Sequence, residues 1–349
     1  MNIELLDRLR AASGEFVPIA ELGADPEAVR LDLNALEAFG FAIEWHPFGG
    51  VAYRGSPDRL CPDQIEWNLG TRLIGRRIAV WNRVASTNDL AASASSSLAN
   101  DGLVILAEEQ SAGRGSRGRA WTVPPSSSIL MSVLLFPPAP LEDPAWLTAL
   151  AAVSVADVVA MGDGDLDRSA GRPSPKIKWP NDVRVAGRKV AGILVERGQG
   201  TVIGIGLNVN VERSDFPDDL HDSATSLQVL HGRRLDRSEV VRNLIRRLDH
   251  YYDQSITYGP DWLNGRYGHY SEHRGHLVEV QVGPELRRGR LVDLDLRTGL
   301  LLGLNDGGAA RIATREIGAI ANRAGSEPWD EADRQAWWEG PAPRSLAGD

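Results

Sequence analysis

Predicted strands follow one another through the middle of this sequence without a helix between each pair. They comprise residues 78–84, 102–107, 129–136 and 176–211. The same region contains an Ala/Val-rich helix predicted at residues 146–161 and a second helix capped by Ser238. A doubly wound parallel sheet needs strands and helices that alternate regularly, whereas clustered strands are typical of α+β domains. We therefore expect residues 64–272 to form one α+β domain.

The first sixty residues show three short helical segments followed by a hairpin. The Asp25-Pro26 pair is a helix start, because Asp caps helices and Pro is favoured at the first helical position. The apolar positions of the helix that follows are Val29, Leu33, Leu36 and Phe39. Gly49-Gly50 then turns one alternating strand back on another. This element order is that of a winged helix-turn-helix module, which we expect over residues 1–60.

Charge argues against strong DNA binding by this module. Residues 1–60 hold five Arg against ten Asp or Glu, and the predicted helix at residues 26–39 has three acids and one Arg. Cationic contacts to phosphates supply most non-specific DNA affinity. We therefore expect weak DNA binding and a module that serves structure or protein contact.

The C-terminal part changes character again. Residues 273–321 read as short strands separated by Gly-containing turns, which predicts a small SH3-like β-barrel. Residues 322–349 are rich in Pro, Gly, Ala and charge, and we expect a mobile tail there. A second mobile segment is expected at residues 162–175.

Composition limits the setting in which the chain works. Unbroken apolar runs such as residues 133–136 are far shorter than the ~18 residues of a membrane-spanning helix, so no membrane association is expected. No basic start followed by an apolar run is seen at the N-terminus, which predicts no secretory signal. The single cysteine, Cys61, excludes an internal disulfide and a metal site built on several thiolates. Together these features favour the cytoplasm. The net charge of −9 indicates that the chain as a whole is no polyanion binder.

Lysine is scarce in this chain. All but three of the 38 basic residues are Arg, and the three are Lys176, Lys178 and Lys189. Lys provides a compact point charge, whereas Arg is a wide planar fork. We expect at least one of the three to do something that Arg cannot, the alternative being chance clustering on an edge strand.

Gly and Arg alternate in the loop at residues 112–121, AGRGSRGRAW. The loop contains three Gly, three Arg and no acid, and it ends in Trp121. Clustered amides and guanidinium groups suit phosphate oxygens, and an aromatic ring can stack on a base. The loop is neither a P-loop nor a G-x-G-x-x-G turn. We expect an anion-binding loop; a disordered Arg/Gly RNA-binding segment is the alternative.

Polar residues flank apolar strands in KIKWPNDV (176–183) and GRKVAGILVE (187–196). A carboxylate such as Asp182 near a phosphate site suggests magnesium, and Lys189 could neutralise both a carboxylate and a phosphate. Gly192 permits close approach of a ligand or backbone. The segment GIGLNVN (204–210) alternates small and aliphatic residues. The alternatives are a plain hairpin turn for the first segment and closely packed strands for the last.

Five segments carry a resemblance to a known family. They are Ser86-Thr87-Asn88, GRGSRGRAW, KWPND, RKVAGILVE and GIGLNVN. In order and approximate spacing they resemble bacterial biotin–protein ligases, and with the winged helix the chain resembles the bifunctional ligase/repressor subgroup over residues 1–321. The resemblance implies a catalytic domain related to class II tRNA synthetases and a C-terminal SH3-like domain. It further implies that ATP and biotin form biotinyl-5′-AMP, that the biotinyl group passes to a lysine of a biotin carboxyl carrier protein, and that the enzyme is a homodimer.

The same resemblance implies roles for individual residues. The biotin-binding set is Ser86, Thr87, Asn88, Gln110, Arg114, Gly115, Ser116 and Lys189. The nucleotide-binding set is Arg117, Arg119, Trp121, Asn181 and Asn208. Catalysis falls to Lys189, Asp182 and Arg117, with Asp182 also the candidate ligand of Mg²⁺. One position departs from the family pattern, since Ser116 stands where many relatives have Arg.

Two rival functions fit parts of the pattern. A lipoate or octanoyl ligase shares the catalytic fold, but KWPND and RKVAGILVE match the biotin side. A ligand-sensing regulator without catalysis would not need Lys189 and Asp182. Pyrophosphate–ATP exchange, measured with biotin and then with lipoate, separates the three.

Overall fold

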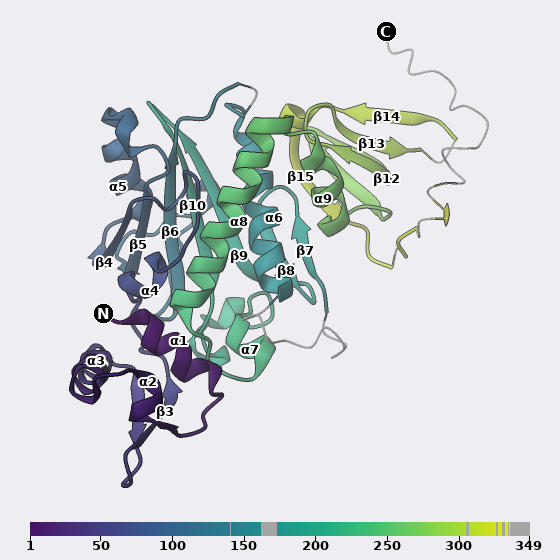
Figure 1. Ribbon diagram of the computed structural model, residues 1–349. Helices are drawn as coiled ribbons and strands as arrows, with labels where there is room; N and C mark the ends of the chain where they lie inside the picture. Colours follow the sequence, from purple (N-terminus) through teal and green to yellow (C-terminus); the bar gives the residue numbers. More distant parts are fainter. Residues whose placement is uncertain are drawn as a thin grey trace.

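The computed structural model describes residues 1–139, 141–161, 173–304, 307–325, 327–329, 332–333 and 335. Along the chain, a helical N-terminal unit is followed by a large mixed domain and then by a small β-unit (Figure 1). Most of the predicted mobile segment at 162–175 lies outside the described residues, as does the predicted tail from residue 336 onward.

Three helices and a small sheet form the N-terminal unit. Its elements are α1 (Ile3–Ala11), β1 (Val17–Pro18), α2 (Ile19–Leu22), α3 (Pro26–Phe39), β2 (Ala42–Trp45) and β3 (Gly50–Gly55), with strand order β1-β3-β2. Asp25 caps α3 by accepting from the N–H groups of Glu27 and Ala28, as its place before Pro predicts. Leu33 and Leu36 are fully buried, so the predicted apolar stripe of α3 does form the core of this unit.

A seven-stranded sheet lies at the centre of the large domain. Its strands are β4 (Ile78–Val84), β5 (Val104–Gln110), β6 (Ser128–Leu135), β7 (Pro175–Lys178), β8 (Asp182–Val185), β9 (Arg188–Arg197) and β10 (Thr201–Asn208). The helices around it are α4 (Pro62–Glu66), α5 (Thr87–Ser93), α6 (Pro144–Met161), α7 (Leu227–His231), α8 (Arg237–Tyr258) and α9 (Trp262–Tyr270). The strand order is β4-β5-β6-β10-β9-β8-β7, with β4 and β5 parallel and the other pairs antiparallel. This sheet confirms the predicted α+β class.

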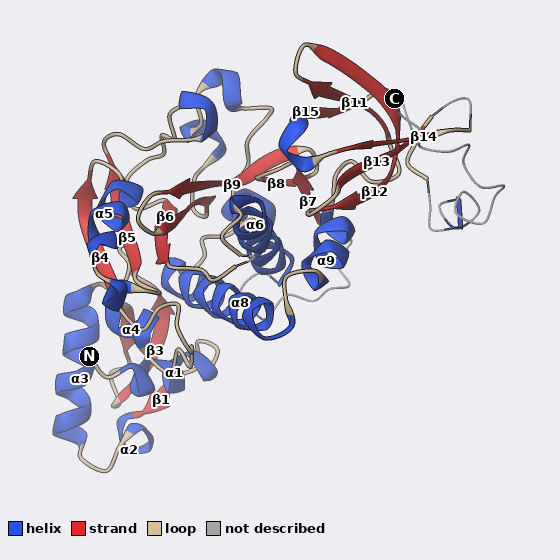
Figure 2. Cartoon of the chain, turned by 90° about the horizontal axis from the view of Figure 1, so that it is seen from above, coloured by secondary structure: helices blue, strands red, loops and turns tan. Residues whose placement is uncertain are grey.

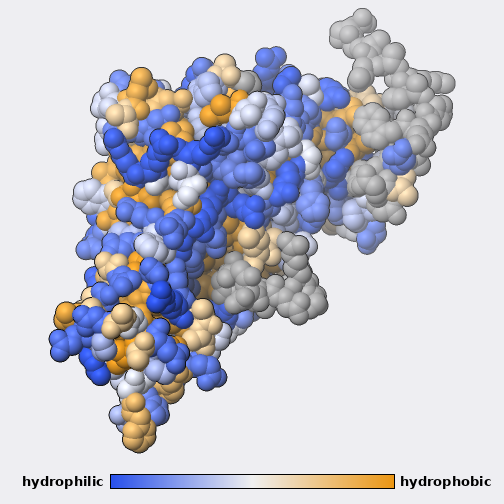
Figure 3. Space-filling view, in the orientation of Figure 1, coloured by the Kyte–Doolittle hydropathy of each residue, from blue (hydrophilic) through white to orange (hydrophobic). Residues whose placement is uncertain are grey.

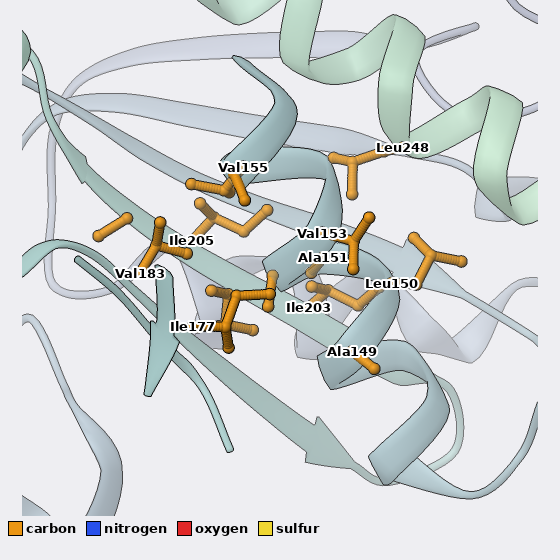
Figure 4. Close-up of a cluster of buried hydrophobic side chains, with 14 of the residues drawn as sticks. Ala149, Leu150, Ala151, Val153, Val155, Ile177, Val183, Ile203, Ile205 and Leu248 are labelled. Carbon is orange, nitrogen blue, oxygen red and sulfur yellow. The ribbon is translucent and has the colours of Figure 1, made fainter. Parts of the chain in front are cut away.

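Helix α6 is the central helix of this domain and lies between the sheet and α8 (Figure 2). Its Val153 belongs to the same buried cluster as Ile203 of β10 and Leu248 of α8 (Figure 4). By length and composition α6 could cross a membrane. It contains no long unbroken apolar run, because polar residues such as Asp157 interrupt it. It is 72% buried inside the domain, so packing against the sheet and α8 accounts for its composition.

The C-terminal unit is a five-stranded antiparallel sheet. It comprises β11 (Leu277–Val282), β12 (Glu285–Asp295), β13 (Gly299–Gly303), β14 (Ala309–Ile312) and β15 (Ile317–Asn322), in the order β14-β13-β12-β11-β15. His273 joins it to the large domain: Nε2 accepts from the N–H of Trp179 at 3.3 Å, and Nδ1 lies 2.7 Å from Asn322 Oδ1. Burial lowers the pKa of His273 to about 4, so at pH 7 the ring is neutral and can make both contacts.

Part of the predicted tail is attached to this unit. Strand β15 ends at Asn322, one residue past the predicted boundary. Farther along, the Trp329 N–H donates to the Gly275 carbonyl at 2.9 Å, and the Arg290 guanidinium lies 4.8 Å from the centre of the Trp329 ring. These contacts hold the described start of the tail against the sheet.

Asp236, which caps α8, joins the N-terminal unit to the large domain. Its Oδ1 accepts from the Ser238 N–H at 2.9 Å. Its Oδ2 accepts from the Ser56 hydroxyl at 2.6 Å, from Gln64 at 2.8 Å and from the Arg10 guanidinium. One carboxylate therefore fixes a helix of each unit and the linker between them.

Candidate active site

Glycines on two neighbouring strands leave one face of the central sheet open. Along β10, Ile203 points into the core under α6, so Gly204 and Gly206 face the opposite side. A Cβ at Gly206 would lie 2.5 Å from the Trp121 ring, and a Cβ at Gly204 would lie 2.3 Å from the Asn88 amide. The glycines of this strand thus allow two of the predicted site residues to pack directly on the sheet.

A cavity on this face gathers every residue of the predicted biotin-binding set. Its lining includes Ser86, Thr87, Asn88, Gln110, Arg114, Gly115, Ser116 and Lys189. Gln110, the last residue of β5, accepts from the N–H and hydroxyl of Thr87 at 2.7 and 3.0 Å. Ser132 of β6 donates to Asn88 Oδ1, and Asn88 Nδ2 donates to Glu196, both at 2.6 Å. The polar groups are therefore oriented by one another before any ligand binds.

The loop at residues 113–121 closes over this cavity as a small hairpin. Its ends pair through the Trp121 N–H, which donates to the Gly113 carbonyl at 2.9 Å. Arg114 ties the loop to α5 through two contacts with the Asp89 carboxylate, at 2.7 and 2.9 Å. Hydrogen bonding to Arg114 lowers the pKa of Asp89, so this ion pair persists as the pH falls into the range where Asp is ordinarily protonated.

We expect biotin and ATP together to slow tryptic cleavage at Arg114, Arg117 and Arg119, because ligands under the loop favour its closed state. Arg114 also lies 3.2 Å from Glu196. Glu196→Gln should therefore speed cleavage of the ligand-free chain by roughly twofold to fivefold, the range for a partly exposed ion pair. Cleavage at Arg287, in the C-terminal unit, serves as the internal control. Equal cleavage of the loop with and without ligands would count against the closure.

A second cavity lies beside the first and suits a nucleotide. Its lining includes Arg119, Trp121, Asp182, Arg184, Lys189, Asn208 and Phe216. Trp121 Nε1 and Asn208 Oδ1 are buried and have no hydrogen-bond partner among the described residues. Buried polar atoms without partners are rare in folded proteins. A donor and an acceptor are thus available here to a base or a ribose.

Lys189 lies where the two cavities meet. It lines both, together with Gly115, Ser116 and Trp121. Its Nζ is 2.6 Å from Asp182 Oδ1 and 5.4 Å from the centre of the Trp121 ring. A cation at such a junction can contact a carboxylate in one cavity and a phosphate in the other, and can thereby offset their mutual repulsion.

Asp182 is a single carboxylate and not part of a metal-binding cluster. Within the described ranges, no group of three or more His, Cys, Asp or Glu is placed to hold a metal ion. Proteins usually bind Mg²⁺ through one or two carboxylates together with substrate phosphates. Asp182 therefore fits a Mg²⁺ ion that arrives with a nucleotide better than a resident metal.

Two residues predicted to contact the nucleotide make other contacts in this structure. The Arg117 guanidinium donates to the Gly318 carbonyl of the C-terminal unit, and the residue adopts a left-handed backbone conformation with a φ of 60°. Asn181 lines the first cavity instead of the second. Its side-chain amide donates to the Ile193 carbonyl at 2.7 Å and so supports β9.

Sequence reasoning also missed residues that the fold brings to the site. Ser132 and Glu196 orient Asn88, whereas Arg184 and Phe216 line the second cavity. A lone hydroxyl within the apolar strand at 129–136 could have drawn attention to Ser132. Glu196 ends the segment GRKVAGILVE, although the pattern gave it no role. Nothing local marks Arg184 and Phe216, since they reach the site through strand pairing and a long loop.

Comparisons with known proteins agree with this arrangement. Residues 80–210 match the sequence model of the Biotin/lipoate A/B protein ligase family. The chain is 30% identical over 314 residues to the bifunctional ligase/repressor BirA of Bacillus subtilis, covering 87% of this chain and 94% of the relative. It is 38% identical over 200 residues to the biotin–[acetyl-CoA-carboxylase] ligase of Mycobacterium tuberculosis, covering 55% of this chain and 72% of that one.

The fold is similar to that of a solved enzyme. The biotin protein ligase from Aquifex aeolicus, in complex with biotin and ATP, superposes with a TM-score of 0.61 at 24% identity, covering 71% of this chain and all of that one. Fold and family together define a ligase-type domain, in which two adjoining cavities share Lys189. The chain belongs to the biotin protein ligase family.

Proposed function

We propose that this protein joins biotin to a carrier protein in two steps, by way of biotinyl-5′-AMP. The observation that carries the proposal is the position of Lys189 at the junction of the two cavities. The cavity lined by Thr87 and Gln110 would hold biotin, and the cavity lined by Trp121 and Asn208 would hold ATP. The reacting carboxylate and α-phosphate would then meet beside Lys189.

In the first step, a carboxylate oxygen of biotin attacks the α-phosphorus of ATP and pyrophosphate leaves. Both reactants are anionic, so the step needs fixed positive charge and close positioning more than it needs a proton carrier. Lys189 supplies the charge, and Asp182 orients it through the 2.6 Å contact. A Mg²⁺ ion bound by Asp182 and the phosphates would supply further charge neutralisation when ATP is present.

In the second step, the neutral amine of a carrier lysine attacks the acyl carbon of biotinyl-5′-AMP and AMP leaves. The mixed anhydride is prone to hydrolysis, so water must be excluded until the carrier arrives. The hairpin at 113–121, held by Arg114 on Asp89, is placed to do this. Its opening would admit the carrier.

The test is to incubate the chain with ATP, biotin and the biotin carboxyl carrier domain of an acyl-CoA carboxylase. We expect the carrier mass to rise by one biotinyl group and biotin to support pyrophosphate–ATP exchange. Exchange with lipoate alone would instead indicate a lipoate ligase. Binding of biotin without any exchange would indicate a sensor that lacks catalysis.

We further assign residues 1–60 to a winged helix that binds DNA weakly, or only as a ligand-loaded dimer. The helix order and the three-stranded sheet support the fold. The surface of this unit supports weak DNA binding. Leu31 of α3 is 71% exposed, and Phe48 at the hairpin tip is 92% exposed. The tip is apolar and is seen at the bottom of Figure 3. Few cations are available for phosphate contacts. Nanomolar, sequence-specific binding to the chain's own promoter at about 150 mM salt, with biotin and ATP present, would overturn this expectation.

We also propose that the C-terminal sheet is an SH3-like barrel, a proposal supported by its five antiparallel strands in the order β14-β13-β12-β11-β15. The natural setting of the reaction is the cytoplasm, where ATP and carrier proteins are found.

We also propose that the protein forms a homodimer through a sheet edge. Within residues 176–211 the edge strand of the sheet is β7, and its Ile177 is bridged to Ser271. Strand β4 is the other edge; within the described residues no strand pairs with its outer side, and its Trp81 is 49% exposed. We expect sedimentation at micromolar concentration to show a dimer with biotin and ATP. A monomer both with and without biotin and ATP would refute the proposed dimer.

A further inference from the structure

We infer that Arg184 binds the β- and γ-phosphates of ATP and stabilises the departing pyrophosphate. The inference rests on the proposed function and adds to it a residue that the sequence patterns did not single out. Its starting point is the alternation of β8. Asp182 and Arg184 share one face of this strand and line the nucleotide cavity, whereas Val183 lies on the other face in the core under α6 (Figure 4).

The charged groups of the two cavities are unevenly distributed. Lys189 lines both cavities, but Arg184 lines only the nucleotide cavity. Lys189 can therefore contact the α-phosphate that meets biotin at the junction, whereas Arg184 can contact the nucleotide alone. In an in-line displacement the leaving pyrophosphate lies opposite the attacking carboxylate, so the β- and γ-phosphates extend away from biotin and into the cavity that Arg184 lines.

Arg184 also has hydrogen-bond donors to spare. Its Nε is buried without a hydrogen-bond partner among the described residues. Its Nη1 makes one long contact with the Gly187 carbonyl, at 3.3 Å, and lies 3.6 Å from Glu272. A guanidinium has five N–H donors in a fork that suits phosphate oxygens. The two contacts it makes are too long to use that capacity.

The other cations near this cavity are already engaged. Lys189 is paired with Asp182 at 2.6 Å. The Arg119 guanidinium donates to the carbonyl and hydroxyl of Ser116, at 3.3 and 3.1 Å. Arg184 differs from both, because its Nε is buried without a partner among the described residues and its nearest carboxylate, that of Glu272, is 3.6 Å away.

The chemistry of the first step makes such a cation useful. As the carboxylate oxygen bonds to the α-phosphorus, the bond from that phosphorus to the bridging oxygen breaks, and both bonding electrons leave with pyrophosphate. Negative charge therefore accumulates on the β-phosphate as the reaction proceeds. A guanidinium at that position stabilises the transition state more than the bound ATP.

Arg184→Gln tests the inference in the full chain, with Arg188→Gln as the matched control. Arg188 begins the adjacent strand and loses the same charge, but it lines neither of the two cavities. In pyrophosphate–ATP exchange, Arg184→Gln should lower kcat/KM for ATP and for pyrophosphate by about tenfold to a hundredfold, the effect of losing a hydrogen bond to a charged group. Part of this loss should be in kcat, because the contact strengthens in the transition state. Transfer from synthetic biotinyl-5′-AMP to a carrier domain should be unchanged, because that substrate lacks the β- and γ-phosphates.

Glu272→Gln separates phosphate binding from a structural role. If Arg184 served only to pair with Glu272, both variants would show the same defect, and the inference would be wrong. An unchanged kcat/KM for ATP in Arg184→Gln, measured beside an active parent chain, would also overturn the inference. So would an equal loss in transfer from preformed biotinyl-5′-AMP. A parent chain that supports no exchange at all would instead contradict the proposed function.

Discussion

Replacing Lys189 with alanine is expected to slow adenylation of biotin by about 10²–10³ while the fold stays intact. The loss corresponds to about 2–4 kcal/mol of transition-state stabilisation, which is typical when one charged contact to a reacting group is removed. The structure adds a second reason for a large effect. Without Lys189, the carboxylate of Asp182, which is only 15% exposed, would face the incoming phosphates unpaired. Pyrophosphate–ATP exchange with purified protein measures the effect.

The chain offers a matched control for this substitution. Lys176 lies on nearby β7, is exposed and lines neither cavity, so Lys176→Ala removes the same charge from the same sheet without touching the site. Lys176→Ala should therefore keep near-normal pyrophosphate–ATP exchange. If Lys189→Ala also kept near-normal exchange, Lys189 would have no role in the mechanism.

The scarcity of lysine drew attention to residues 176–189, but it could not by itself distinguish Lys189 from Lys176 and Lys178. In the β8–β9 pairing Lys189 stands opposite Arg184, and only the folded strands bring its Nζ within 2.6 Å of Asp182. The alternation of β10 was more informative. Its small residues left a closely packed strand as the alternative, and the groups that pack on them are the Trp121 ring and the Asn88 amide. A local pattern thus predicts that a strand leaves room for another group, and the rest of the fold decides which group fills that room.

Two predicted nucleotide-binding side chains have protein partners that no local pattern indicates. Arg117 stands in an anion-binding pattern, yet its guanidinium contacts Gly318, 201 residues away. Asn181 sits in a recognisable motif, yet its amide is used to support the backbone of β9. A motif fixes the residue types available at a site, whereas long-range packing decides which of them remain free for a ligand.

The joint between the N-terminal unit and the large domain also lacked any sequence signal, and it contains a buried ion pair. Arg237 Nη2 lies 2.6 Å from Glu108 Oε2, and these side chains are 3% and 9% exposed. Arg237 also donates to the Ser128 carbonyl at 2.9 Å, and Glu108 accepts from the Leu60 N–H at 2.5 Å. Glu108 is two residues before Gln110 on β5, so this pair fixes both the linker and the strand that carries a predicted biotin contact.

Arg237→Met is therefore expected to lower the free energy of unfolding of the large domain by about 3–5 kcal/mol, because it leaves the Glu108 carboxylate buried and unpaired. Urea unfolding followed by tryptophan fluorescence measures the change. Arg234→Met is the matched control: Arg234 pairs with Asp58 nearby, but the two side chains are 52% and 78% exposed, so the cost should stay below about 1 kcal/mol. Adding Glu108→Gln to Arg237→Met should restore much of the stability, since Gln keeps an acceptor for Leu60 but carries no charge. If Arg237→Met were no more destabilising than Arg234→Met, or if the second substitution restored nothing, the buried charge would not be what holds this joint.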